Sequence, residues 1–314
     1  MVDASHLPGR RRLLRLAGCA LALGTLPALA RASDSPSPNG TITRAIPASD
    51  ERLPVIGMGT WITFNVGQDE AARARRTAVL RTFFERGGRL VDSSPMYGSA
   101  EAVIGHALER LEGRHDLFAA SKVWTPSGSK GRAQIERSAG LWGIERFDLM
   151  QIHNLVAWEA HMETLLAMRE SGRLRYVGIT TSHGRRHDDI ERIMRDYPID
   201  FVQASYSLAN REVEDRILPL AREKGIAFIA NRPFQGGRLI DRVKRHPLPD
   251  WAPEAGMHNW AEFLLKFIAA HPDVTCAIPA TSRVEHMREN MGALAGPLPD
   301  EAMRRRMVEH VRGL

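Results

Sequence analysis

Asp92, Tyr97, Lys122 and His153 could together form a site that transfers a proton. A tyrosine alone, with an ordinary pKa of about 10, is a weak acid at neutral pH. A nearby ammonium group favours the phenolate and lowers that pKa, and a carboxylate would keep the ammonium charged and in place. A histidine can donate a hydrogen bond to a substrate oxygen. Together these groups suit the protonation of a carbonyl oxygen as hydride reaches its carbon.

Three of the four residues end short apolar runs. Asp92 ends "RLVD", Lys122 ends "LFAASK" and His153 ends "FDLMQIH". Because side chains alternate along a strand, each titratable group would share a face with apolar or small residues of its run. Asp92 and Lys122 could form no more than a structural ion pair, and a single histidine is more often a core residue. Their combination with Tyr97 favours a catalytic role.

The elements that must position these residues alternate along the chain. Eight apolar runs, from "PVIGMGT" to "TCAIPAT", are separated by longer segments with apolar residues at helical spacing. Several of these segments end at glycine, a typical helix stop. Strands that alternate with helices predict a parallel α/β sheet joined by crossovers. Eight such units in about 260 residues match a (β/α)8 TIM barrel, whose active site lies at the carboxyl ends of the strands.

A doubly wound open sheet is the alternative fold. It would normally show a Gly-x-Gly-x-x-Gly turn after its first strand, and "IGMGTW" is not one. We therefore expect a single barrel domain over residues 53–314. The residues before it, 33–52, predict a linker and the start of a short hairpin, because "TITRAI" alternates.

The first 32 residues predict an export signal. "GRRRLLRLAGCALALGTLPALARA" has a charged start, an apolar stretch and an Ala-x-Ala end. "GRRRLLR" resembles the twin-arginine motif, which predicts export of the folded chain by that machinery to the bacterial periplasm. An ordinary secretory leader is the alternative, and "LAGC" also resembles a lipoprotein cleavage box. A stable membrane span needs about 20 apolar residues, so we expect none.

Charge and cysteine content exclude other classes of function. The leader contributes +5 − 1 = +4 of the net charge of +6, and the remaining +2 forms no basic stripe. Nucleic acid is therefore not an expected partner. Without its leader the chain keeps only Cys276, so it cannot form an internal disulfide. No cluster of residues has metal-ligand spacing, so no metal is expected. We expect a monomer.

The motifs that carry the four residues resemble the aldo-keto reductase superfamily. "VDSSPMYG", "SKVW" and "DLMQIHN" occur in family order with "GMGTW", "RYVGIT", "QASYSL" and "IPATSRVEHMREN", from about Leu53 to Asn290. The resemblance implies a barrel that binds a nicotinamide cofactor without a Rossmann fold. It also implies hydride transfer to an aldehyde or ketone. Tyr97 would then be the acid, Lys122 and Asp92 would tune it, and His153 would orient the carbonyl.

The same resemblance implies a cofactor site with two departures from the family pattern. Gln203 matches the residue that contacts the carboxamide, but Thr180 and Thr181 stand where Ser-Asn is usual. Asn231 replaces the tyrosine that stacks on the nicotinamide, and Arg232 is expected to compensate at the pyrophosphate. The expected cofactor contacts are Thr180, Thr181, Gln203, Asn231, Arg232, Phe234, Gly236, Thr281, Arg283, Arg288, Glu289 and Asn290.

The end of the cofactor site decides between NADPH and NADH. Ala280 stands where the family often has a lysine. Arg283, with His286 or Arg288, is expected to bind a 2′-phosphate instead, because a guanidinium group suits phosphate geometry. Glu289 and Asn290 match residues that hold the adenine. We expect NADPH, with NADH the less favoured cofactor.

The substrate pocket is the least defined part of the prediction. Trp61, Met96, Trp124 and Trp158 fall near the expected mouth and predict a hydrophobic pocket, with core packing as the alternative. Histidines such as His183 are expected to be solvated. The sequence therefore predicts an NADPH-dependent carbonyl reductase of unspecified substrate. The alternative function is a cofactor-binding sensor or partner subunit with little turnover, because the stacking tyrosine is absent.

Overall fold

The computed structural model of the chain describes residues 40–111 and 116–314. The predicted export signal, residues 1–32, lies outside these ranges, as do residues 33–39 of the predicted linker. Within the ranges, no helix is both long enough and apolar enough to cross a membrane.

Eight parallel strands form the centre of the molecule, in the order in which they occur along the chain. Parallel bridges from Ile56 to Ala277 and from Gly59 to Ala280 join the last strand region to the first, so the sheet closes into a barrel. The expected (β/α)8 TIM barrel is confirmed, and the open doubly wound sheet is wrong. The strands are β3 (Met58–Gly59), β4 (Leu90–Asp92), β5 (Phe118–Val123), β6 (Phe147–His153), β7 (Leu174–Thr180), β8 (Phe201–Ser205), β9 (Ala227–Asn231) and β10 (Cys276–Ala277).

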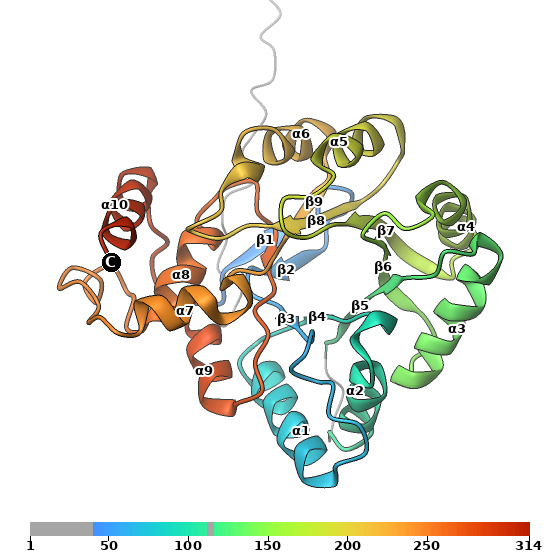
Figure 1. Ribbon diagram of the computed structural model, residues 1–314, viewed down its shortest axis with the longest axis horizontal. Coiled ribbons are helices and arrows are strands. Elements are labelled where there is room, and N and C mark those ends of the chain that lie inside the picture. Colours follow the sequence, from blue (N-terminus) through green and yellow to red (C-terminus); the bar gives the residue numbers. More distant parts are fainter. Residues whose placement is uncertain (1–39, 112–115) are drawn as a thin grey trace, which may run out of the picture. The chain divides into compact units, whose positions relative to one another are not determined.

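Helices surround the barrel and cover the outer faces of its strands (Figure 1). Their apolar faces pack on the alternate strand residues that point outward, which is why each helical segment carries apolar residues at helical spacing. Gly225, with φ of 65°, ends one of them as predicted. The helices are α1 (Glu70–Glu85), α2 (Ala100–Glu109), α3 (Gly131–Trp142), α4 (Trp158–Glu170), α5 (His187–Asp196), α6 (Ile217–Lys224), α7 (Arg238–Val243), α8 (Trp260–Ala269), α9 (Val284–Gly292) and α10 (Glu301–Arg312).

The predicted hairpin is present and closes one end of the barrel. Strands β1 (Thr43–Ala45) and β2 (Arg52–Pro54) pair antiparallel. Ile46 and Leu53 from this hairpin are fully buried in one cluster with side chains from the amino-terminal parts of the barrel strands, such as Leu90 and Phe118. The hairpin therefore fills the amino-terminal end, and the carboxyl-terminal end is left for the loops that carry the predicted site.

Candidate active site

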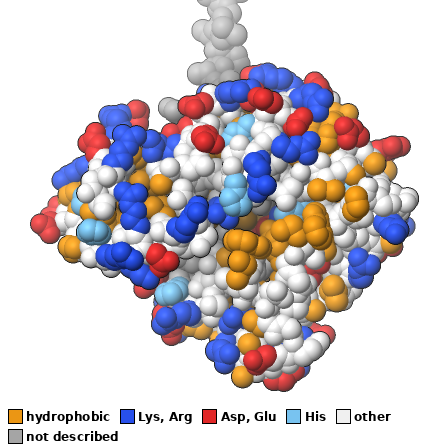
Figure 2. All heavy atoms as spheres, in the orientation of Figure 1, with side chains coloured by type: hydrophobic (Ala, Val, Ile, Leu, Met, Phe, Trp, Pro, Cys, Tyr) orange, Lys and Arg blue, Asp and Glu red, His pale blue; other side chains and the backbone are white. Residues whose placement is uncertain are grey.

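A cavity of about 380 Å³ lies at the carboxyl ends of the strands, where the surface is hollowed (Figure 2). It collects residues from the loops after six of the strands, which are far apart in the sequence. Most of the sequence-predicted site residues line it. These are Trp61, Asp92, Met96, Tyr97, His153, Thr180, Thr181, Gln203, Asn231, Arg232, Phe234 and Gly236.

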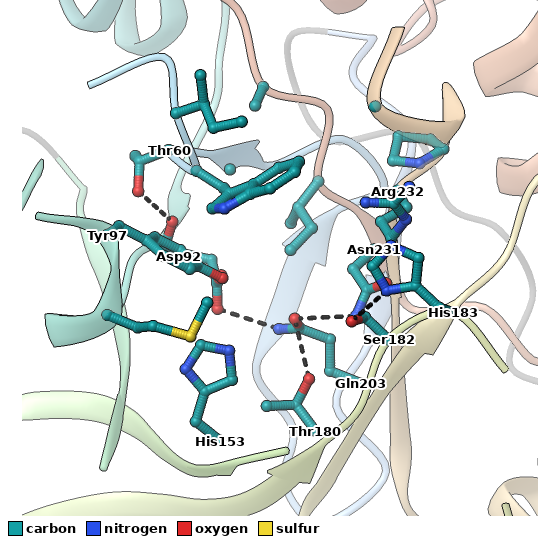
Figure 3. A pocket seen from close by; sticks show the side chains of 18 of the residues that line it. Thr60, Asp92, Tyr97, His153, Thr180, Ser182, His183, Gln203, Asn231 and Arg232 are labelled. Atoms are coloured by element: carbon teal, nitrogen blue, oxygen red, sulfur yellow. Dashed lines mark hydrogen bonds between the residues drawn. The ribbon is translucent and has the colours of Figure 1, made fainter. Parts of the chain in front are cut away.

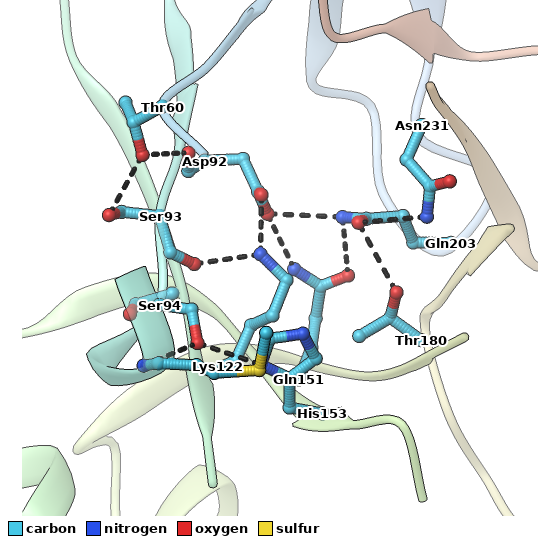
Figure 4. Close-up of polar contacts among 12 residues, drawn as sticks. Thr60, Asp92, Ser93, Ser94, Lys122, Gln151, His153, Thr180, Gln203 and Asn231 are labelled. Carbon is cyan, nitrogen blue, oxygen red and sulfur yellow. Dashed lines mark hydrogen bonds and ion pairs between the residues drawn. The ribbon is translucent and has the colours of Figure 1, made fainter. Parts of the chain in front are cut away.

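Asp92 and Lys122 form an ion pair at the base of this cavity, and both side chains are almost completely buried. The other carboxylate oxygen, Oδ1, accepts hydrogen bonds from Gln151 Nε2 at 2.9 Å and from Gln203 Nε2 at 3.0 Å (Figure 4). Lys122 Nζ also donates to the carbonyl oxygen of Ser93 at 2.7 Å. Burial lowers the pKa of the Lys122 ammonium, but its interactions with Asp92 and Tyr97 raise that pKa by more. Lys122 therefore stays charged inside the protein.

Tyr97 ends a short 3-10 turn, Pro95–Tyr97, directly after β4. Lys122 Nζ lies 5.0 Å from the centroid of its ring, and the His153 ring packs edge-on at 5.7 Å. Burial raises the pKa of Tyr97, the Lys122 charge lowers it, and the Asp92 charge raises it again. The net pKa is above its ordinary value. The expected net lowering by the ammonium is therefore wrong for this structure, because burial outweighs it.

His153 is a buried, neutral imidazole beside Tyr97 (Figure 3). Burial, together with the charge of Lys122, lowers its pKa to about 3. Its Nδ1 lies 2.7 Å from Ser94 Oγ, which also accepts a hydrogen bond from the backbone N–H of Met96. When the Ser94 hydroxyl donates to Nδ1, the ring hydrogen resides on Nε2 and is available to a substrate oxygen.

A buried amide network forms the floor of the cavity next to this group. Asn231 Nδ2 donates to the carbonyl oxygen of Thr181 at 2.9 Å, and Asn231 Oδ1 accepts from Ser205 Oγ at 2.8 Å. Gln203 Oε1 accepts from Thr180 Oγ1 at 3.2 Å. The Thr181 hydroxyl is buried and has no partner among the described residues. Because buried polar atoms are nearly always paired, this hydroxyl fits a polar group of a bound ligand, such as a carboxamide.

A second cavity, of about 540 Å³, shares residues Phe234, Gly237 and Ala280 with the first. Two adjoining cavities fit an elongated dinucleotide whose rings lie apart. Predicted residues Thr281, Glu289 and Asn290 line the second cavity, as does His286. Lys244 and His246 also line it, and the sequence reasoning did not identify them as site residues.

Arg283 and Arg288 are not among the residues that line either cavity. Arg283 precedes α9 and lies 3.7 Å from Glu285 in an exposed ion pair. Arg288 is exposed on α9, two positions after His286 and therefore on a different face of the helix. Of the three residues expected at the 2′-phosphate, only His286 lines a cavity.

The tryptophans divide between the cavity and the rest of the molecule. Trp61 lines the cavity with 40% of its surface exposed, whereas Trp124, which is 41% exposed, does not line it. Trp158 is only 7% exposed, and its ring packs edge-on against Tyr197. The pocket assignment for Trp158 is wrong. Trp158 is the first residue of α4. Because it shares a helix face with Met162 and Leu165, its side chain is buried in the core with theirs.

His183 is exposed, as expected, and it also lines the cavity together with Arg185. Both lie in the loop after β7, where His183 has a φ of 65° and Arg186 a φ of 58°. Non-glycine residues rarely adopt this conformation, and such strain is concentrated at functional sites. The sequence "SHGRRHDD" carries no periodic signal that would place this loop over a cavity.

Comparison with known proteins decides the family. The model of the aldo/keto reductase family matches residues 55–308. The chain belongs to the aldo/keto reductase family. It is therefore an oxidoreductase that acts on carbonyl groups with a nicotinamide cofactor.

Individual relatives agree with this assignment. Methylglyoxal reductase of Escherichia coli (strain K12) is 29% identical over 258 residues, which cover 79% of this chain and 87% of that protein. Probable aldo-keto reductase 1 of Glycine max is 26% identical over 269 residues, covering 72% and 77%. An aldo-keto reductase of Klebsiella pneumoniae in complex with NADPH has a TM-score of 0.67 at 25% identity and covers 83% of this chain and 92% of its own. The holo form of an aldo-keto reductase of Bacillus halodurans has a TM-score of 0.70 at 23% identity, with 86% and 96% covered.

Proposed function

We propose that this protein is an NADPH-dependent reductase that converts aldehydes or ketones to alcohols. The observation that carries the proposal is the gathering of four groups at one end of the cavity, three of which line it. A buried Asp92–Lys122 ion pair lies against Tyr97, and a neutral His153 lies beside the same ring. The chain belongs to a family whose solved members include an NADPH complex.

The residues of this site have separate tasks in that reaction. The bound cofactor would supply the hydride. His153 Nε2–H donates to the carbonyl oxygen and orients the carbonyl carbon. As the carbon–oxygen π bond breaks, the O–H bond of Tyr97 breaks and its proton forms the alcohol. Lys122 stabilises the resulting phenolate, Asp92 holds Lys122 in place, and solvent returns the proton to Tyr97.

A tyrosine with a raised pKa can still act as the acid, because the substrate oxygen becomes more basic during the reaction. Charge that develops on the carbonyl oxygen makes that oxygen a strong base in the transition state, so a very acidic phenol is not required. What matters is that the phenolate left behind lies next to a permanent ammonium. Burial of Lys122 strengthens this interaction because the local dielectric constant is low.

The cofactor would lie across both cavities. Its nicotinamide end would be held by Thr181, Gln203, Asn231 and Arg232. Its adenine would be held by Glu289 and Asn290. The proposed preference for NADPH now depends on His286 and on Lys244, which line the adenine-side cavity. The name of the Escherichia coli relative supports small reactive aldehydes, such as methylglyoxal, as the first substrates to try.

Replacement of the proposed acid tests this function. The purified protein should oxidise NADPH when methylglyoxal or 4-nitrobenzaldehyde is added. We expect Tyr97→Phe to lower kcat by at least about 100-fold, within the range for a general acid. NADPH affinity, measured by fluorescence titration, should change little. Full activity of Tyr97→Phe would show that another group is the acid.

A cofactor-binding sensor is the second candidate function. The observation that favours it is the floor of the cavity, where hydrogen bonds hold Asn231, the residue that replaces the stacking tyrosine expected from the family pattern. Tight NADPH binding without turnover across a broad carbonyl panel would support the sensor instead of the reductase.

The leader supports a further part of the proposal, export to the periplasm by the twin-arginine pathway. Folded export would allow the protein to carry its cofactor with it. Residues 1–35 fused to a folded reporter should direct the reporter to the periplasm, and Arg10→Lys with Arg11→Lys should prevent this. Export that does not depend on these arginines would indicate an ordinary secretory leader.

A further inference from the structure

One side of the catalytic cavity carries arginine side chains that form no ion pair with a carboxylate of the described residues. Arg185 and Arg232 line the cavity, and burial, together with the charges of Arg238 and Arg185, lowers the pKa of Arg232. Within residues 40–111 and 116–314, none of these three guanidinium groups forms an ion pair with a carboxylate. The neighbouring Arg186, by contrast, pairs with Asp189 at 2.8 Å. Cations grouped in this way at a cavity are available to an anionic ligand.

The loop that carries Arg185 is held firmly beside the carbonyl-binding residues. The backbone N–H of His183 donates to Ser205 Oγ at 3.0 Å. Arg186 Nη1 donates to the carbonyl oxygen of Leu155 at 3.0 Å, which ties this loop to the one after β6. Strands β6 and β7, which precede these two loops, pair in parallel, and His153 lies opposite Thr180. Arg185 therefore lies in the loop that follows β7, the strand next to the one that ends in His153.

The hydrogen bonds of His183 determine which of its ring nitrogens carries the hydrogen. Ser182 Oγ lies 2.8 Å from Nδ1, and Arg185 Nη2 lies 3.2 Å from the same atom. Arginine can only donate, so Nδ1 is the acceptor and the ring hydrogen is on Nε2. This side of the cavity thus offers a guanidinium group and an imidazole N–H, a donor pair that suits the oxygens of a carboxylate.

The remaining rim of the cavity is apolar. Trp61, Ile62 and Met96 keep 40%, 63% and 38% of their surfaces exposed around the mouth. Figure 2 shows the apolar side chains on one side of the hollow and the basic side chains and histidine on another. A small uncharged aldehyde would use only part of this surface. A compound with an apolar body and a negative charge would use all of it.

A bound dinucleotide accounts for only part of the positive charge. Its diphosphate carries two negative charges, which Arg232 and Arg238 could balance. These two residues belong to the loop and helix that follow β9, where Gly236 lies next to the Arg232 guanidinium. Arg185 belongs to a different loop, after β7. On the basis of the proposed reductase function, we propose that the preferred substrate carries a carboxylate as well as its reducible carbonyl, and that Arg185 and His183 bind that carboxylate.

A matched pair of substrates tests this proposal. The full-length protein is assayed with NADPH and either 4-carboxybenzaldehyde or uncharged 4-nitrobenzaldehyde. We expect Arg185→Gln to lower the ratio of the two kcat/KM values, carboxylated over uncharged, by at least about tenfold, because a charged hydrogen bond is lost. Arg185→Lys should restore part of the ratio. Arg195→Gln, an exposed arginine of α5 that does not line the cavity, is the control and should leave the ratio unchanged.

Two results would overturn the proposal. One is the same ratio in Arg185→Gln as in Arg195→Gln. The other is a weaker NADPH affinity in Arg185→Gln with no change in the ratio, which would assign this arginine to the cofactor phosphates.

Binding measured without turnover separates this inference from the proposed reaction. Calorimetric titration of the NADP⁺-loaded protein should show binding of benzoate but not of benzamide, and Arg185→Gln should abolish the benzoate signal. If no aldehyde is reduced but this pattern appears, the reductase proposal fails and the anion site stands. If aldehydes are reduced but benzoate and benzamide bind alike, the anion site fails and the reductase proposal stands.

Discussion

At the level of single residues, the site depends on charges that are kept out of water. The Asp92 carboxylate has hydrogen-bond partners on both oxygens, and Lys122 has a carboxylate and a backbone carbonyl. Full pairing is what allows two ions to remain charged in a buried position. Burial, together with the charge of the same ammonium, lowers the pKa of His153 and prevents it from gaining a proton. His153 is therefore a neutral imidazole over the whole physiological pH range.

The low pKa of His153 has a measurable consequence for stability. An unfolded histidine has a pKa of about 6.5, whereas burial and Lys122 lower the folded pKa to about 3. Between these values the unfolded chain binds a proton that the folded chain does not, so the free energy of unfolding falls as the pH falls. From pH 6.5 to 5 this group alone should account for about 1–2 kcal/mol.

Comparison with His153→Gln isolates that contribution from other titrating groups. The wild type should lose about 1–2 kcal/mol more than the variant between pH 6.5 and 5, measured by urea denaturation at each pH. For each protein, the change in the free energy of unfolding is calculated relative to its own value at pH 7. Parallel pH curves for the two proteins would mean that His153 is protonated normally in the fold.

At the level of elements, the sequence predicted the strands and misplaced several side chains. Parallel strands buried on both faces appear as apolar runs, so all eight were identifiable. Trp158 was misplaced because a large aromatic residue near a strand end is equally compatible with a pocket and with a core. Arg283 was misplaced because it lies before α9, where helical spacing does not set its direction. His286, Glu289 and Asn290 do share one face, at the spacing of neighbours on a helix.

The position of Trp158 predicts a change in stability and not in substrate binding. Trp158→Ala should lower the free energy of unfolding by about 3–5 kcal/mol, because it leaves a cavity against Tyr197. The KM for 4-nitrobenzaldehyde should remain within about twofold, since Trp158 does not line the site. Trp61→Ala is the matched control and should raise that KM with little loss of stability. A large rise in KM for the Trp158 variant alone would return this residue to the pocket.

The charges of the loops were the part of the site that sequence reasoning could assess least. Of the four proposed catalytic residues, Asp92, Lys122 and His153 lie at or near the carboxyl ends of strands and Tyr97 follows one, so strand order and alternation place them without coordinates. His183 and Arg185 lie in a loop that has no such periodicity, and its path depends on hydrogen bonds to Ser205 and Leu155. These contacts join segments that are distant in the sequence. They become visible only when the barrel is closed.

At the level of the whole molecule, the two ends of the barrel have separate roles. The hairpin closes the amino-terminal end, where Leu53 is fully buried among interior residues and Glu51 pairs with Arg89 and Arg175. The carboxyl-terminal end carries loops, exposed apolar residues and the strained backbone after β7. In barrels of this type, stability is concentrated at the first end and activity at the second.

A pair of truncations at opposite ends tests this separation. Leu53→Ala removes a fully buried side chain and should lower the free energy of unfolding by about 2–5 kcal/mol. Its kcat/KM for 4-nitrobenzaldehyde, measured well below the melting temperature, should stay within about twofold. Ile62→Ala removes a side chain that is 63% exposed at the cavity mouth, so it should leave stability within about 0.5 kcal/mol. It should also reduce kcat/KM for this apolar substrate. If Leu53→Ala impairs turnover as strongly as Ile62→Ala does, the hairpin and the site are coupled through the barrel, and the two ends do not act independently.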